Sequence, residues 1–238
     1  MSKYFILSKP NNCDIINDNN NQIIYLKEKI YILPSNNISY YIKNGLFEKN
    51  LIEYCKKFCN KDKNILDIGS HSGTYSISLA DYCKNIYAFE PQKMTYYSLC
   101  GSVVLSNIKN INCINFGLGS IEQVGMQKLK ICSIDGGGSS LHNNSNNILD
   151  TEEIEIRTLD SFDIENISFI KIDVEDNELQ VLLGSKNTLM KSKYPTILFE
   201  MNIKNIELIN FLKSLNYNII SINEYNNMFL AINEYNNL

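Results

Sequence analysis

The chain has 238 residues, of which 44% are hydrophobic, and a formal net charge of -4. Its length suits one sizeable α/β domain, and its acidic balance offers no general attraction to nucleic acid or to a membrane surface, so neither is expected as a partner. Seven cysteines without framework spacing indicate reduced thiols. Because no apolar run reaches the length of a signal peptide or a membrane span, we expect a cytoplasmic protein.

Residues 1–63 are expected to form an extension packed on the main domain. The runs QIIYL and KIYIL lie on either side of a charged turn at residues 27–29 and predict a hairpin. Apolar residues then recur at helical spacing through residues 45–59, which predicts a helix.

From residue 64 onward, segments typical of strands and helices alternate. Strands are predicted at residues 64–69, 85–91, 111–119, 169–172 and 194–202, and helices at residues 74–83, 92–107, 179–183 and 206–215. Strand-like pieces at residues 127–132 and 153–159 flank a long Gly/Ser/Asn loop, and residues 217–222 and 227–232 predict a closing antiparallel pair. This alternation is typical of a doubly wound, mostly parallel sheet with helices on both faces, and we expect residues 64–238 to be one domain.

Acidic residues end four of the predicted strands: Asp67, Glu90, Asp173 and Glu200. Ligands of a doubly wound sheet bind at the carboxyl ends of its strands. Glu90 follows Gly69 by 21 residues, close to the interval at which such folds place an acid on the ribose of an adenosine cofactor. The glycine loop is DIGSHSG and lacks the GxGxxG pattern, so it disfavours NAD and favours a cofactor that carries adenosine without phosphate.

An acidic corner follows the strand at residues 169–172, where Asp173, Glu175, Asp176 and Glu178 occur within six residues. Crowded carboxylates raise one another's pKa, which suits one of them to act as a general base. The same group could instead hold Mg²⁺, which would lower the pKa of a substrate hydroxyl. We favour a base without metal, although Mg²⁺ stays open. Asp176 and Glu178 are expected to serve mainly the start of the next helix.

The chain resembles the FkbM family of S-adenosylmethionine-dependent methyltransferases between residues 45 and 200. The resemblance is carried by the ordered motifs NILDIGSHSGTYSISLA, YAFEPQ, NFGLGS, GGGSSL, RTLDSF, IKIDVEDNELQVLLG and ILFEM. It implies the Rossmann-like methyltransferase fold with a seven-stranded sheet whose last strand is antiparallel. It also implies methyl transfer to a hydroxyl of a sugar, a glycan or another small molecule.

The resemblance also implies roles for individual residues. S-adenosylmethionine would contact, from its methionine part to its adenine, Asp67, Gly69, Ser70, His71, Gly73, Asp173, Glu90, Asn115, Phe116 and Gly117. From their positions at or just past strand ends, and not from the resemblance, we expect Asp173, Glu175 and Glu200 to be the catalytic residues. The chain departs from the family pattern at His71, where Asn is usual, and at Asp176, where Gly is usual.

Three questions stay open in the sequence. Lys171 fits a solvated strand position and a counter-charge inside the site equally well, and Asp160 could belong to the site or only cap a turn. The acceptor is not specified. The competing functions are a cofactor-binding module without catalytic activity and a metal-dependent O-methyltransferase.

Overall fold

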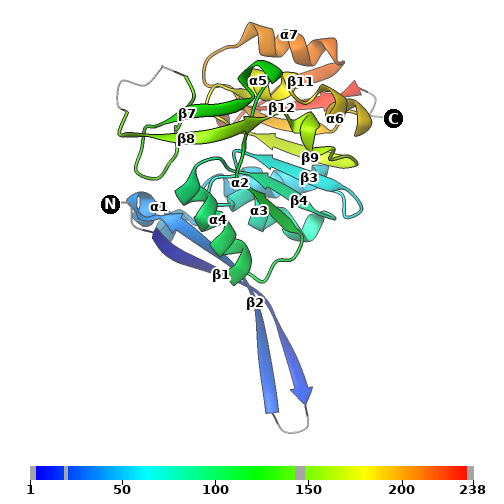
Figure 1. Ribbon diagram of the computed structural model, residues 1–238. Coiled ribbons are helices and arrows are strands. Elements are labelled where there is room, and N and C mark those ends of the chain that lie inside the picture. The colour runs from blue at the N-terminus through cyan, green and yellow to red at the C-terminus, as the bar shows by residue number, and fades with distance from the viewer. Residues whose placement is uncertain (1–3, 19–20, 143–147, 235–238) are drawn as a thin grey trace.

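The computed structural model describes residues 4–18, 21–142 and 148–234 (Figure 1). Its centre is a seven-stranded sheet of order β11-β12-β10-β9-β3-β4-β5, in which β12 is antiparallel and the other strands are parallel. The strands are β3 (Asn64–Ile68), β4 (Ile86–Phe89), β5 (Ile111–Ile114), β9 (Ile167–Ile172), β10 (Thr196–Glu200), β11 (Tyr217–Ile222) and β12 (Tyr225–Asn233). The predicted Rossmann-like fold with a mostly parallel sheet is confirmed.

Helices cover both faces of this sheet. One face carries α2 (Lys49–Cys55), α3 (Thr74–Leu79) and α4 (Lys93–Leu105), and the other carries α5 (Glu178–Leu183), α6 (Lys186–Lys191) and α7 (Ile206–Ser214). In β3, Ile65 belongs to the first core and Leu66 to the second, both at most 1% exposed. A strand buried on both faces reads as a continuous apolar run, which is why the sequence signals this sheet so clearly. Within the described residues, no helix combines the length and apolarity that crossing a membrane requires.

The N-terminal hairpin differs from the predicted one. β1 (Tyr4–Asp18) and β2 (Asn21–Pro34) pair along their whole length and project from the body of the molecule (Figure 1). The predicted turn at residues 27–29 is wrong, because these residues lie inside β2, where Lys29 is opposite Lys9. Lys29 is accommodated in the strand because its Nζ pairs with Asp81 Oδ2 at 2.9 Å and donates to Ser78 O at 3.1 Å. The last described pair of the hairpin is Asp18 and Asn21, and residues 19–20 between them lie outside the described residues.

The base of this hairpin is fixed to the main domain. The backbone N–H groups of Ile30 and Ile32 donate to the hydroxyls of Ser106 and Ser102, at 2.8 and 2.9 Å. These serines are one helical turn apart at the end of α4, so they match alternate residues of the strand.

The helix predicted at residues 45–59 is shorter than expected. After α1 (Ile38–Asn44), Gly45 and Glu48 have φ values of 79° and 53°, which interrupt helical geometry. The second helix therefore begins at α2 and continues into the short helix η2 (Lys56–Phe58). The other single-turn helices are η1 (Ser35–Asn37), η3 (Ala80–Tyr82), η4 (Ile121–Gln123) and η5 (Leu159–Phe162).

The region between β5 and β9 forms a separate sheet of order β6-β8-β7, made of β6 (Gly117–Leu118), β8 (Asp150–Arg157) and β7 (Gly125–Ile131). The two predicted strand-like pieces are confirmed as β7 and β8, but the strand expected at residues 111–119 is two strands. Asn115 separates them, since its side-chain amide donates to the carbonyl oxygens of Glu90 and Pro91. Leu129, Ile154 and Ile156 give this sheet a small core of its own.

Candidate active site

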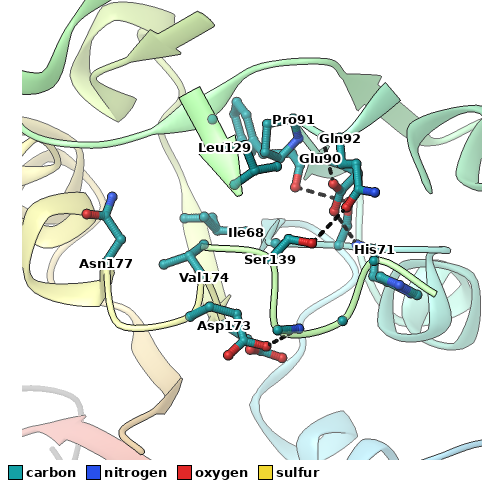
Figure 2. Close-up of a pocket in the computed structure, with 18 of the residues that line it drawn as sticks. Ile68, His71, Glu90, Pro91, Gln92, Leu129, Ser139, Asp173, Val174 and Asn177 are labelled. Carbon is teal, nitrogen blue, oxygen red and sulfur yellow. Dashed lines mark hydrogen bonds between the residues drawn. The ribbon is translucent and has the colours of Figure 1, made fainter. Parts of the chain in front are cut away.

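A cavity of about 310 Å³ lies at the carboxyl ends of β3, β4 and β9 (Figure 2). The second sheet and the loop at residues 135–139 also line it. Its volume is at the lower end of the range for small-molecule sites. The position agrees with the rule that doubly wound sheets bind ligands at strand ends.

The turn after β3 depends on two glycines. Gly69 has φ 73°, and a Cβ placed there would lie 1.8 Å from the carbonyl oxygen of Asp173. Gly73 has φ 85°, and its Cβ would lie 2.5 Å from Leu99 Cδ1. The N–H groups of Gly69 and Ser70 both donate to the carbonyl oxygen of Phe89, at 3.0 and 2.9 Å. The turn is thus held by contacts with the end of β4 and with Asp173 after β9, while the backbone of Gly69 lines the cavity.

Glu90 is buried at the end of β4, where three donors hold its carboxylate. Oε2 accepts from the N–H of His71 at 2.8 Å, while Oε1 accepts from Gln92 N at 2.8 Å and Thr95 Oγ1 at 2.9 Å. Figure 2 shows Glu90, His71 and Gln92 grouped around these bonds. Burial raises the pKa of Glu90, and His71 and the three donors oppose that shift. Each carboxylate oxygen can accept two bonds, so Oε2 keeps one acceptor position.

His71 ties the glycine turn to the loop above it. Its Nε2 lies 2.6 Å from the carbonyl oxygen of Asp135, and Nδ1 lies 3.2 Å from Ser72 Oγ. Because a carbonyl oxygen can only accept, Nε2 must carry the proton. His71 therefore connects the glycine turn to the loop at residues 135–139 that closes the cavity.

An apolar part of the cavity, the slot at Phe116, is lined by Phe116, Leu129 and Ile156. Phe116 lines it, with the guanidinium of Arg157 3.8 Å from the centre of the Phe116 ring. Gly117 lets β8 approach, since a Cβ there would lie 2.4 Å from Ile156 Cδ1. Asn115 is not part of the lining and fixes the slot from behind through its bonds to Glu90 and Pro91.

Lys171 is a buried counter-charge inside the site, which settles the two interpretations of this residue. It is 4% exposed, and its Nζ donates to Gly69 O at 2.6 Å and to Asp173 Oδ2 at 3.2 Å. Burial acts to lower the pKa of Lys171, but the carboxylates of Asp173, Asp67 and Glu48 outweigh burial and hold it above the ordinary value. The ammonium group stays charged.

Asp67 lies behind the glycine turn and does not line the cavity. Its Oδ2 accepts from the N–H and hydroxyl of Ser76, at 3.0 and 2.5 Å, which ties α3 to β3. Its Oδ1 has no hydrogen-bond partner among the described residues and lies 3.8 Å from Lys171 Nζ. Asp67, Gly73 and Asn115 were predicted to contact the cofactor, but they lie behind the cavity wall and hold the residues that line it.

The three predicted catalytic carboxylates meet at one point. One oxygen from each of Asp173, Glu175 and Glu200 lies within 4.8 Å of the others. Burial raises the pKa of Glu200 to about 9, with Asp173 and Glu175 adding to the shift, and burial likewise raises the pKa of Glu175. Oxygen donors of this kind suit a hard cation such as Mg²⁺. Both Glu200 oxygens already accept hydrogen bonds, from Asn227 and Asn202, at 2.7 and 2.8 Å.

The acidic corner turns sharply after Asp173. Glu175 and Asp176 have φ values of 55° and 75°, a conformation that glycine adopts without cost. The positive φ explains why the family usually has glycine at position 176. Asp can replace it here because Asp is one of the few other residues that tolerate this conformation. Glu178 is buried and accepts from the N–H of Val174 at 3.1 Å, as expected of a residue that stabilises the helix start, and burial raises its pKa to about 7.

Two other predicted positions have structural partners. Asp160 accepts from the N–H groups of Asn187 and Thr188, at 3.1 and 2.8 Å, so it caps the start of α6. His142 is partly buried, and its Nε2 lies 3.2 Å from Asn177 Oδ1. His142 and Asp176 line a second cavity of about 430 Å³ beside the acidic corner.

For two parts of the site, Glu48 and the GGGSSL motif, no role was predicted. Glu48 reaches the cavity from the turn before α2, and its Oε2 accepts from the hydroxyl of Tyr75 at 2.7 Å. The GGGSSL motif forms the roof, where Gly138 N donates to Glu175 Oε1 at 2.8 Å and Ser139 Oγ to Gln92 Oε1 at 3.2 Å. A run of three glycines was an available signal for close backbone approach.

Known proteins agree with this arrangement. A family model described as Methyltransferase FkbM domain matches residues 67–219, more than half of the chain. The fold is similar to that of methyltransferase FkbM from Methylobacillus flagellatus, with a TM-score of 0.51 and 16% identity over 72% of this chain and 44% of that one. This chain therefore spans less than half the length of that protein. It is also similar to precorrin-6y C5,15-methyltransferase from Geobacter metallireducens, with a TM-score of 0.50 and 10% identity over 81% and 92% of the two chains. No curated protein matches the sequence.

Proposed function

The chain belongs to the FkbM methyltransferase family, and from that premise we propose that it transfers a methyl group from S-adenosylmethionine to a hydroxyl of a sugar, a glycan or another small molecule. The observation that carries the proposal is Glu90, a buried carboxylate at the end of β4 with one acceptor position free. An acid at this point of a doubly wound fold suits the hydroxyls of a ribose.

The cavity offers a place for each part of the cofactor. Of the residues assigned to cofactor binding, those that line it are Gly69, Ser70, His71, Glu90, Phe116, Gly117 and Asp173. The slot at Phe116 has an apolar lining, which suits an adenine, and Gly69 exposes backbone to the same cavity. NAD is disfavoured, because the loop between the two glycines has side chains where a pyrophosphate would need bare backbone.

The cofactor supplies an electrophilic methyl group on a sulfonium centre. The chain must then align the acceptor, exclude water and remove the hydroxyl proton. We assign the last task to Glu175, since burial raises its pKa toward the range of a useful base. Glu200, with a pKa of about 9, carries a proton at neutral pH and hydrogen-bonds Asp173.

A metal-dependent reaction is the second candidate, because three carboxylate oxygens within 4.8 Å of one another match a cation site. Asp173, Glu175 and Glu200 would hold the ion, which would lower the pKa of the acceptor hydroxyl. The bonds that Asn202 and Asn227 already donate to Glu200 favour the reaction without metal.

The test combines binding with product analysis. Calorimetry should show S-adenosylhomocysteine binding with micromolar affinity and no binding of NAD. Mass spectrometry of hydroxylated acceptors incubated with labelled S-adenosylmethionine should show a methylated product that forms equally well with EDTA. Loss of product in EDTA would favour the metal-dependent reaction. Binding of the cofactor without turnover across the acceptor panel would favour a non-catalytic module, and binding of NAD alone would contradict the proposal.

A further inference from the structure

Glu48 is a cavity residue that the mechanism above leaves without a role. It lies in the turn between α1 and α2 with φ 53°, in the left-handed region that residues other than glycine rarely adopt. Tyr75, 6% exposed at the start of α3, donates its hydroxyl hydrogen to Glu48 Oε2. This bond and the turn together direct the carboxylate into the cavity.

Glu48 lies at the end of the cavity away from Glu90. Glu90 ends β4 and Asp173 follows β9, with β3 between these two strands. Strands are spaced by about 4.8 Å, so the two acids are about 10 Å apart across the glycine turn. Glu48 belongs to the β9 side, because Lys171 and Asp173 both act electrostatically on it and Lys171 Nζ lies 5.5 Å from the centre of the Tyr75 ring.

Acidic groups outnumber basic groups at this end of the cavity. Asp67, Asp173 and Glu48 are grouped around the single ammonium of Lys171. Lys171 uses its hydrogen bonds on Gly69 O and Asp173 Oδ2, and it reaches Glu48 only through space. A ligand that brings a cationic nitrogen to this end would satisfy the remaining charge. Burial also raises the pKa of Glu48, so a nearby cation would keep it ionised.

We propose that Glu48 is a cofactor-binding residue whose carboxylate accepts hydrogen bonds from the α-ammonium group of the methionine part of S-adenosylmethionine, with Tyr75 as its positioning residue. The inference rests on the proposed cofactor. It extends the site to the N-terminal segment, since a ribose held at Glu90 leaves the amino-acid end of the cofactor pointing across β3 toward Asp173 and Glu48.

Three ligands that share adenosine and sulfur test the proposal by calorimetry on the full chain. S-adenosylhomocysteine carries the ammonium and the carboxylate, its decarboxylated form keeps only the ammonium, and 5′-methylthioadenosine lacks both. In Glu48→Gln the affinity for the first two should fall about 10- to 100-fold, as for the loss of a charged hydrogen bond. The affinity for 5′-methylthioadenosine should change less than twofold.

Two further variants guard against a purely structural effect. Tyr75→Phe keeps the charge and loses the bond, so it should weaken S-adenosylhomocysteine about threefold and spare 5′-methylthioadenosine. Glu53→Gln, an exposed acid on α2 paired with Lys56, should change neither affinity. Should Glu48→Gln not fold, Glu48→Asp should give a three- to tenfold loss with the same ligand pattern.

The outcomes separate the two proposals. An equal loss for all three ligands, or no loss for any, would overturn the role of Glu48 while the cofactor assignment stands. Wild-type protein that binds 5′-methylthioadenosine but not S-adenosylhomocysteine would overturn the role of the amino-acid end. Wild-type protein that binds none of them would overturn the proposed function and this inference with it.

Discussion

Glu90 and the cluster of Asp173, Glu175 and Glu200 both lie at the carboxyl ends of strands. The two regions differ in how the protein stabilises the carboxylate groups. Glu90 is surrounded by backbone and hydroxyl donors that do not titrate. Asp173, Glu175 and Glu200 face one another, and the pKa values of Glu175 and Glu200 are raised by burial and by this crowding. The first arrangement suits a ligand that must be held in every state of the reaction. The second suits a place where a proton must move.

The strongest way to sharpen this contrast is Glu175→Gln. Turnover should fall about 10²- to 10⁴-fold, the usual range for losing a general base, while S-adenosylhomocysteine affinity stays within about twofold. Asp173→Asn is the matched variant and should instead weaken the cofactor, because it removes the charge beside Lys171. Steady-state kinetics and calorimetry measure the two effects. A fully active Glu175→Gln protein would show that the base lies elsewhere.

Gly69 lies between the two regions, so Gly69→Ala should disturb the backbone that positions both Glu90 and Asp173. Its Cβ would meet the backbone of Asp173, which a rotamer change cannot relieve, and we expect a loss of at least about 3 kcal/mol in the free energy of unfolding. Gly45→Ala is the control: its φ of 79° is similar, but a Cβ there would meet nothing within 4 Å. Because its ψ of -152° lies in a region that is nearly restricted to glycine, Gly45→Ala should cost about 1–3 kcal/mol through backbone strain alone. Denaturant melts measure both, and equal losses would contradict the steric explanation.

At the first region, Glu90→Ala should weaken S-adenosylhomocysteine by about 1.5–3 kcal/mol, the range for hydrogen bonds that involve a charged group. Calorimetry gives the dissociation constant, and a thermal melt checks that the loop at His71 stays folded. Glu122→Ala, an acid exposed on η4, is the control and should leave the constant unchanged. An unaltered constant in Glu90→Ala would remove this residue from the ribose.

In the cluster of Asp173, Glu175 and Glu200, the raised pKa of Glu200 should make the free energy of unfolding depend on pH. Its pKa is raised from 4.5 to about 9, so between these values the folded chain binds more protons than the unfolded chain. The unfolding free energy therefore falls as pH rises from about 4.5 to about 9. In Glu200→Gln the decline between pH 6 and pH 9 should be smaller by about 1–2 kcal/mol, allowing for solvent screening. Urea titrations at both pH values measure it, and identical slopes would mean that Glu200 is ionised throughout.

The smallest expected effect is that of Asp176→Gly. Because φ is 75° at this position, glycine should relieve backbone strain and raise the free energy of unfolding by about 0.5–1 kcal/mol. Activity should be unchanged or higher, since Glu175 keeps its place. Loss of activity in a stable variant would give the Asp176 carboxylate a catalytic role that we have not assigned.

The sequence predicted those features that depend on alternation and on strand ends. The order of strands and helices, the convergence of Asp173, Glu175 and Glu200, and the burial of Glu90 beside the glycine turn all follow from rules about parallel sheets. Side-chain direction was harder. Asp67 ends its strand as the family motif requires, but it faces α3 and Ser76.

The remaining differences involve contacts between distant segments. Glu48 reaches the cavity because two residues with positive φ turn the chain before α2, and single-residue φ values leave little trace in composition. The second sheet forms because Asn115 bonds to Glu90 and Pro91 and ends β5 early. The hairpin turn was misplaced because charged residues inside a strand resemble a turn when no partner strand is known.

The single ammonium of Lys171 has a consequence for sequence change. Three segments of the chain supply acids to it, at Asp67, Asp173 and Glu48. Replacing Lys171 with an apolar residue would leave three negative charges in a poorly solvated place, whereas losing one acid leaves the others paired. The four positions are therefore epistatic: an apolar residue at 171 becomes tolerable only after the acids have been neutralised. Among related sequences, we expect these positions to covary as one unit.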